Sequence, residues 1–107
     1  MTTFSDRELG EEANFAHDEE MQFRITARRN RLLGQWAAER MGLSAAETDG
    51  YAKSVVQADF EESGDEDVIR KLLGDLTQAG CEVDEAEVRA ALDAKSVEAR
   101  RQLMSEG

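Results

Sequence analysis

The stretch from Phe15 to Leu43 constrains the fold of this chain more than any other part of it. Apolar residues recur in it three or four positions apart, which predicts one apolar face on a long helix. Gly42 is well placed to end this helix, because glycine readily adopts the left-handed conformation found at helix C-termini. We therefore expect the rest of the chain to pack along the apolar face formed by Met21, Ile25, Leu32, Leu33, Trp36, Ala37 and Met41.

Capping patterns mark the starts of two further helices. Ser44 with Glu47, and Asp84 with Glu87, have the three-residue separation at which side chains satisfy free backbone N–H groups at a helix N-terminus. Helical apolar patterns follow both starts. Their residues are Tyr51, Ala52, Val55, Val56 and Phe60 in one segment, and Val88, Ala91, Leu92, Ala99 and Leu103 in the other.

Another helix is predicted between these two, from about Asp65, whose side chain can cap it, to Gly80. No segment shows the two-residue alternation of a strand, proline is absent, and the predicted connections are short. The fold class is therefore predicted as all-α, a four-helix bundle with a mobile N-terminal segment. Residues 1–18 are assigned to that segment and residues 19–107 to the four-helix domain. The apolar face of the helix predicted from about Asp65 to Gly80 consists of Val68, Ile69, Leu72, Leu73 and Leu76.

Two glycines fall inside the predicted helices, at Gly34 and Gly74. A glycine in a helix interior costs about 1 kcal/mol relative to alanine. We therefore expect close approach of a neighbouring helix at both positions.

Composition excludes several classes of function. The net charge of −11 argues against binding to nucleic acid, which requires clustered Lys and Arg. No apolar run is long enough for direct membrane insertion and no signal-peptide pattern opens the chain, so a cytoplasmic location is expected. His17 and Cys81 are each the only residue of their type, which leaves no set of metal ligands or catalytic triad. No enzyme activity, metal or cofactor is therefore expected.

The long helix also carries a row of cations that we call the arginine ridge, formed by Arg24, Arg28, Arg29 and Arg31. Guanidinium groups suit carboxylates or phosphates. One interpretation is ion pairing with the surplus of acids in this chain. The other is binding of an anionic ligand such as a nucleotide, with Trp36 or Phe23 stacking on the base.

Composition leaves two interpretations of residues 1–14, which contain few strong hydrophobes. They are a frayed terminus, or a segment that folds on a partner.

Several motifs of this chain resemble the zeta-type inhibitor subunit of bacterial rotary (F-type) ATP synthases, in order and spacing over about residues 1–71. They are Phe15-Ala-His-Asp-Glu-Glu20, Ala27-Arg-Arg-Asn30, Leu32-Leu-Gly34, Trp36-Ala-Ala-Glu39, Ala58-Asp-Phe-Glu-Glu62 and Gly64-Asp-Glu-Asp-Val68.

The resemblance implies a specific mechanism. In this family a mobile N-terminal segment precedes a four-helix domain and becomes helical on entering a catalytic alpha/beta interface of the synthase, near the central stalk. It blocks ATP hydrolysis and spares synthesis, and places the protein at the inner face of the membrane through the synthase. The resemblance favours the folding segment over the frayed terminus. It implies Phe4 and Phe15 as apolar anchors and Arg7, Glu8, His17 and Asp18 as polar contacts.

The segment departs from the family pattern at three positions. Glu11 stands where the family has Phe, Asn14 stands where it has Lys, and the family has no glycine where Gly10 stands. Compared with the family pattern, the segment therefore lacks one apolar anchor, one positive charge and some helix propensity. The resemblance therefore leaves open binding to the synthase without strong inhibition.

Overall fold

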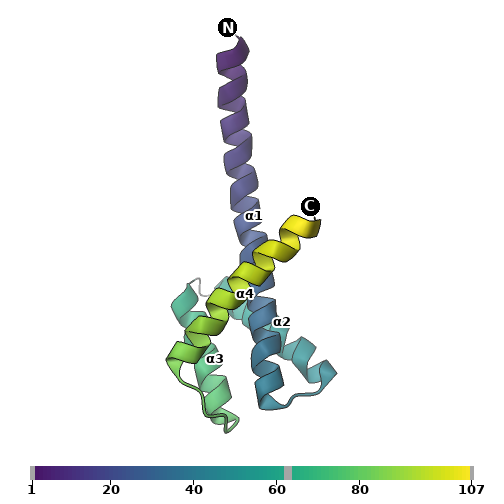
Figure 1. The fold of residues 1–107 in the computed structure, drawn as a ribbon, viewed down its shortest axis with the longest axis vertical. Coiled ribbons are helices and arrows are strands. Elements are labelled where there is room, and N and C mark those ends of the chain that lie inside the picture. Colours follow the sequence, from purple (N-terminus) through teal and green to yellow (C-terminus); the bar gives the residue numbers. More distant parts are fainter. Residues whose placement is uncertain (1, 62–63, 107) are drawn as a thin grey trace.

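The fold consists of four helices arranged along the longest of them (Figure 1). The computed structural model describes the side chains of residues 19–59 and 64–105. In that part of the chain there is no strand, and the predicted all-α, four-helix fold is confirmed. The predicted mobility of residues 1–18 and the boundary after residue 18 lie outside the described side chains. The helices are α1 (Thr2–Met41), α2 (Ala45–Glu61), α3 (Asp65–Gln78) and α4 (Glu85–Glu106).

Helix α1 is the organising element, as its apolar face predicts, and it contacts α2, α3 and α4. The residues of its apolar face belong to two separate clusters of buried apolar side chains. Leu33 and Ala37 belong to the main core with residues of the other three helices, whereas Ile25 packs with Ala99 and Leu103 of α4. The rest of the buried main core is Val55, Val68, Ile69, Leu72, Leu76, Val88 and Leu92.

Side chains cap the starts of α2 and α4 as predicted. The Ser44 backbone N–H donates to Glu47 Oε1 at 2.9 Å, and the Glu47 N–H donates to Ser44 Oγ at 3.2 Å. At α4 the Glu87 N–H donates to Asp84 Oδ1 at 2.9 Å. Both pairs satisfy backbone donors that a helix start would otherwise leave free.

The predicted capping role of Asp65 is wrong. The N-cap of α3 is Gly64, and no side chain caps this helix. The Asp65 carboxylate instead accepts a hydrogen bond from Arg29 Nη1 at 3.0 Å. The three acids of the first turn, Asp65, Glu66 and Asp67, still lie at the positive end of the helix dipole, where negative charge is favourable.

The two glycines inside helices differ. A Cβ on Gly34 would lie 2.6 Å from Ala52 Cα, so α1 and α2 approach closely there, as predicted. At Gly74 the prediction is wrong, because nothing lies within 4 Å of the corresponding Cβ position and the residue is exposed.

The reciprocal cap gives a first testable expectation. Ser44→Ala should lower the free energy of unfolding by about 1 kcal/mol, the usual cost of losing an N-cap side chain. Ala46→Ser, an exposed position in the same turn, is a matched control with little expected effect. Urea denaturation of the two variants checks this, and equal stabilities would contradict a role for the cap.

The same cap predicts how stability depends on pH. The hydrogen bond from the Ser44 backbone N–H lowers the pKa of Glu47 below its ordinary value of 4.5. The stabilisation is therefore fully present above pH 4.5 and is lost as the pH falls through the folded-state pKa. An NMR titration of the Glu47 carboxyl should show this lowered pKa, and a pKa at or above 4.5 would contradict the hydrogen bond.

Candidate functional site

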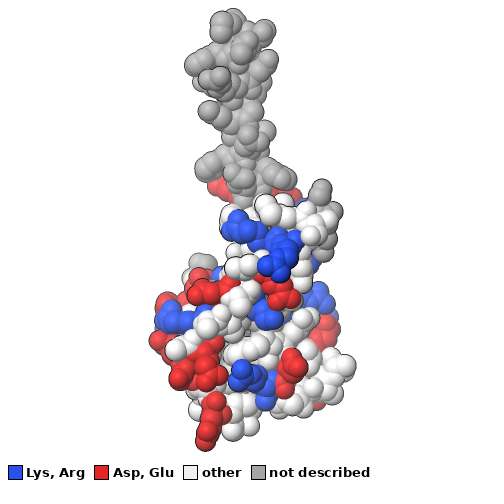
Figure 2. Space-filling view, viewed as in Figure 1, with Lys and Arg blue, Asp and Glu red and all other residues white. Residues whose placement is uncertain are grey.

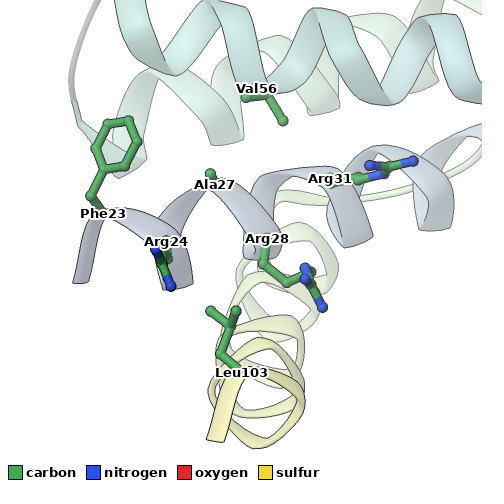
Figure 3. A pocket seen from close by; sticks show the side chains of 7 residues that line it. All are labelled: Phe23, Arg24, Ala27, Arg28, Arg31, Val56 and Leu103. Carbon is green, nitrogen blue, oxygen red and sulfur yellow. The ribbon is translucent and has the colours of Figure 1, made fainter. Parts of the chain in front are cut away.

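Three members of the arginine ridge lie around one open hollow where α1 meets α2 and α4. Arg24, Arg28 and Arg31 line it together with Phe23, and the hollow has a volume of about 440 Å³ (Figure 3). Residues of three helices complete the lining, namely Ala27 of α1, Val56 of α2 and Leu103 of α4. Phe23 is 56% exposed, so this basic hollow has an accessible aromatic ring at one end. We call it the arginine groove.

Each arginine of the groove already has an intramolecular contact. Arg24 pairs with Glu20 at 3.2 Å, and Arg31 lies 3.6 Å from Asp49. Both pairs are more than half exposed, and such pairs contribute between 0 and about 1 kcal/mol. Arg28 Nη1 donates to Gln102 Oε1 of α4 at 2.8 Å. The two exposed pairs are weak enough for an external anion to compete with them.

Arg29 does not share the groove, because its side chain turns into the protein. It is 7% exposed and donates from Nε and Nη2 to Asn30 Oδ1, at 3.1 and 2.9 Å. Its third contact is the ion pair with Asp65 at the start of α3. A buried guanidinium is costly unless its N–H groups are satisfied. Arg29 therefore acts as a structural link between α1 and α3.

Trp36 also lies away from the groove. Its ring packs against the main core, and the Arg40 guanidinium lies 5.1 Å from the ring centroid. Arg40 in turn pairs with Glu87 of α4 at 3.4 Å. Of the two aromatic residues considered for stacking on a ligand, Phe23 alone lines the arginine groove.

The residues assigned to partner binding lie outside the described side chains. They are Phe4, Arg7, Glu8, Phe15, His17 and Asp18, all within α1 as bounded by Thr2–Met41. Sequence reasoning missed Ala27, Val56 and Leu103 as part of the groove. The helical spacing of Val56 and Leu103 did predict that each lies on an apolar helix face. That spacing does not say which residues of such a face line the arginine groove.

Polar contacts elsewhere link helices to one another. Tyr51 of α2 donates to Asp75 Oδ2 of α3 at 2.7 Å, and Lys71 Nζ lies 3.1 Å from the same oxygen. Burial, with the contact to Asp75, raises the pKa of the Tyr51 hydroxyl well above its ordinary value, so this group stays protonated. These contacts hold α2 against α3.

The described part of the chain contains neither a grouping of metal ligands nor a membrane-spanning helix. Among these residues no group of three or more His, Cys, Asp or Glu side chains is arranged to hold a metal ion. No helix, over the same residues, has the length and apolar character needed to cross a bilayer.

Lys and Arg lie among carboxylates over the visible surface of the molecule (Figure 2). A group of Lys and Arg lies just below the part drawn in grey, whereas Asp and Glu dominate the lower left of this face. On this face, one group of basic side chains therefore lies near the end of the four-helix body from which α1 continues towards the N-terminus.

Comparison with known proteins shows the family of this chain. The family model described as ATPase inhibitor subunit zeta matches residues 1–102. A chain whose solution structure was determined by NMR is 52% identical, with a TM-score of 0.71, and the match covers 81% of this chain and 99% of that one. No curated protein matches. Because the family model spans nearly the whole sequence, the chain belongs to the ATPase inhibitor subunit zeta family.

Proposed function

We propose that this chain inhibits ATP hydrolysis by an F-type ATP synthase through its N-terminal segment, which enters a catalytic alpha/beta interface beside the central stalk. The observation that carries the proposal is the extent of the family match, which begins at residue 1 and so includes the segment ahead of the four-helix domain. The chain acts as a regulatory subunit and not as an enzyme. In the cell it is cytoplasmic and peripheral to the membrane through the synthase.

The charge and apolar residues of the segment support this role. Residues 1–20 carry seven acids and one base, and Phe4, Leu9 and Phe15 are spread along them. Among the described residues, the contacts of α1 with the apolar clusters begin at Met21. A segment of this composition loses conformational entropy when it becomes ordered, so it folds only where contacts with a partner outweigh that loss.

The three departures from the family pattern provide a gain-of-function test. A variant with Gly10→Ala, Glu11→Phe and Asn14→Lys should inhibit hydrolysis at a lower concentration than the natural sequence. Burying a Phe side chain contributes about 1.5–3 kcal/mol before ordering costs. Gly10→Ala adds up to about 1 kcal/mol if residue 10 lies inside the bound helix.

The assay adds each purified protein to the organism's own detergent-extracted ATP synthase and measures hydrolysis and co-purification. Gly74→Ala is a control for a general change in helix stability, because this exposed glycine lies on α3, away from the segment. Equal or weaker inhibition by the triple variant would contradict docking of the segment as a helix in an interfacial groove.

The arginine groove supports a second candidate function, the binding of an anionic ligand such as a nucleotide. Three guanidinium groups and an accessible aromatic ring around one hollow provide partners for phosphates and a base. Titration with ADP should give saturable shifts of the amides of residues 23–31 at micromolar concentrations. Arg24→Ala with Arg31→Ala should abolish them, whereas Arg70→Ala, an exposed arginine on α3, should not. Linear shifts without saturation would exclude the site.

A further inference from the structure

Two arginines at the C-terminal end of α4 differ from the other cations of the described part of the chain. Arg100 and Arg101 are exposed, and neither lies within ion-pair distance of a described carboxylate. The other described Lys and Arg residues all have partners: nine of them pair with described acids, and Arg28 bonds to Gln102 among other contacts. In a chain of net charge −11, two adjacent arginines that pair with no described carboxylate stand out.

Exposed apolar side chains lie on the same face of α4. Val97 is 58% exposed and Met104 is 69% exposed, and with Phe23 they are the large hydrophobic residues that stand out at the described surface. Positions 97, 101 and 104 are separated by four and three residues, so they line one side of the helix, with Arg100 beside them. We call Val97, Arg100, Arg101 and Met104 the α4 patch.

The α4 patch lies beside the part of α1 that leads to the N-terminal segment. Ala99 and Leu103 pack against Ile25, with Met21 against the same cluster. The last turns of α4 therefore lie next to the N-terminal end of the described part of α1, and Figure 1 shows α4 crossing α1 towards that end. If residues 1–18 enter an interface of the synthase, the α4 patch comes to the rim of that interface.

We infer that the α4 patch is a second docking surface, which binds an acidic, partly apolar protein surface of the ATP synthase at the rim of the interface. The inference rests on the proposed function for its partner. Arginines take part in bidentate pairs with carboxylates, and an exposed Met and Val suit an adaptable apolar contact. A second contact close to the inserted segment strengthens binding, because its effective concentration is high once the segment is bound.

An acidic protein surface fits the α4 patch better than an anionic membrane does. Each Lys or Arg near an anionic bilayer contributes only about 1 kcal/mol, so two arginines hold a membrane weakly. The surplus of 24 acidic over 13 basic residues would moreover repel an anionic bilayer as a whole. A local cluster of carboxylates on a protein avoids much of that repulsion.

The test compares two charge-reversal variants of the full chain. The first carries Arg100→Glu and Arg101→Glu. The matched control carries Lys53→Glu and Arg70→Glu, which make the same change in net charge at side chains that are both 76% exposed, on α2 and α3. Binding to the purified ATP synthase is measured at low and high salt, and thermal unfolding of each variant verifies the fold.

We expect the patch variant to bind about tenfold more weakly than the control, with a smaller dependence on salt. Val97→Ala with Met104→Ala should also weaken binding without adding charge. Equal binding by the two charge-reversal variants would overturn the inference. The same variants are also mixed with vesicles of phosphatidylglycerol and phosphatidylcholine. If the patch variant loses binding to these vesicles but not to the synthase, the partner is a membrane and the inference is overturned.

A variant lacking residues 1–18 separates this inference from the proposed function. If the truncated chain still binds the synthase and the patch variant does not, insertion of the segment is wrong and the docking surface stands. If the patch variant binds like its control while the truncated chain does not bind, the docking surface is wrong and insertion stands. A full chain that does not bind the synthase at all would overturn both.

Discussion

Removing residues 1–18 should abolish inhibition of ATP hydrolysis and leave the thermal unfolding of the four-helix domain nearly unchanged. In the described part of the chain, both apolar clusters draw their members from Met21 onwards, so the truncation removes none of them. Hydrolysis by the synthase should therefore return to its uninhibited rate with saturating truncated protein. The measurements are an ATPase titration and a melt followed by circular dichroism.

A matched variant separates the loss of apolar anchors from the loss of charge and length. Phe4→Ser with Phe15→Ser keeps every charge and all 107 residues, yet removes the two aromatic side chains of the segment. It should lose most of the inhibition, since a buried Phe contributes about 1.5–3 kcal/mol. A truncated protein that inhibits as well as the full chain would refute insertion of the segment.

The second large effect concerns the contact between α1 and α2. Gly34→Ala should destabilise the protein by about 1–3 kcal/mol, the range for overpacking a well-packed core. The added Cβ would lie 2.6 Å from Ala52 Cα and 3.1 Å from Ala52 Cβ, and the backbone atom cannot move unless the helix moves. Chemical denaturation measures the effect.

Gly74→Ala is the control for helix propensity in this experiment. Nothing lies within 4 Å of its Cβ position, so alanine should stabilise α3 by up to about 1 kcal/mol. The same substitution should thus have opposite signs at the two glycines. Stabilisation at Gly34 would show that the two helices can separate at no cost, and would contradict the close packing.

The helices and most caps could be predicted from the sequence because their causes are local. Apolar spacing and the pairs Ser44–Glu47 and Asp84–Glu87 act within a few residues, so their chemistry can be read along the chain. Asp65 shows where this fails. Its carboxylate could cap α3 or pair with a distant cation, and the choice depends on Arg29, which folding brings next to it.

The candidate site was predictable only in part, for a related reason. The spacing of Arg24, Arg28 and Arg31 places them on one side of α1, and they do line one groove. Arg29, one position from Arg28, is buried because Asn30 and Asp65 accept its hydrogen bonds. Whether an arginine faces solvent depends on its acceptors, and one of them, Asp65, comes from another helix, which helical spacing alone does not reveal.

The division of the apolar face of α1 between two clusters has a consequence for local opening. The last turns of α4 are held by a small cluster around Ile25, Ala99 and Leu103, whereas α2 and α3 share the main core. Segments with few buried apolar contacts open at a lower free energy than the whole molecule. We therefore expect the C-terminal turns of α4 to open from α1 at a lower free energy than the main core, so that this end of the molecule adjusts to a partner without unfolding the rest.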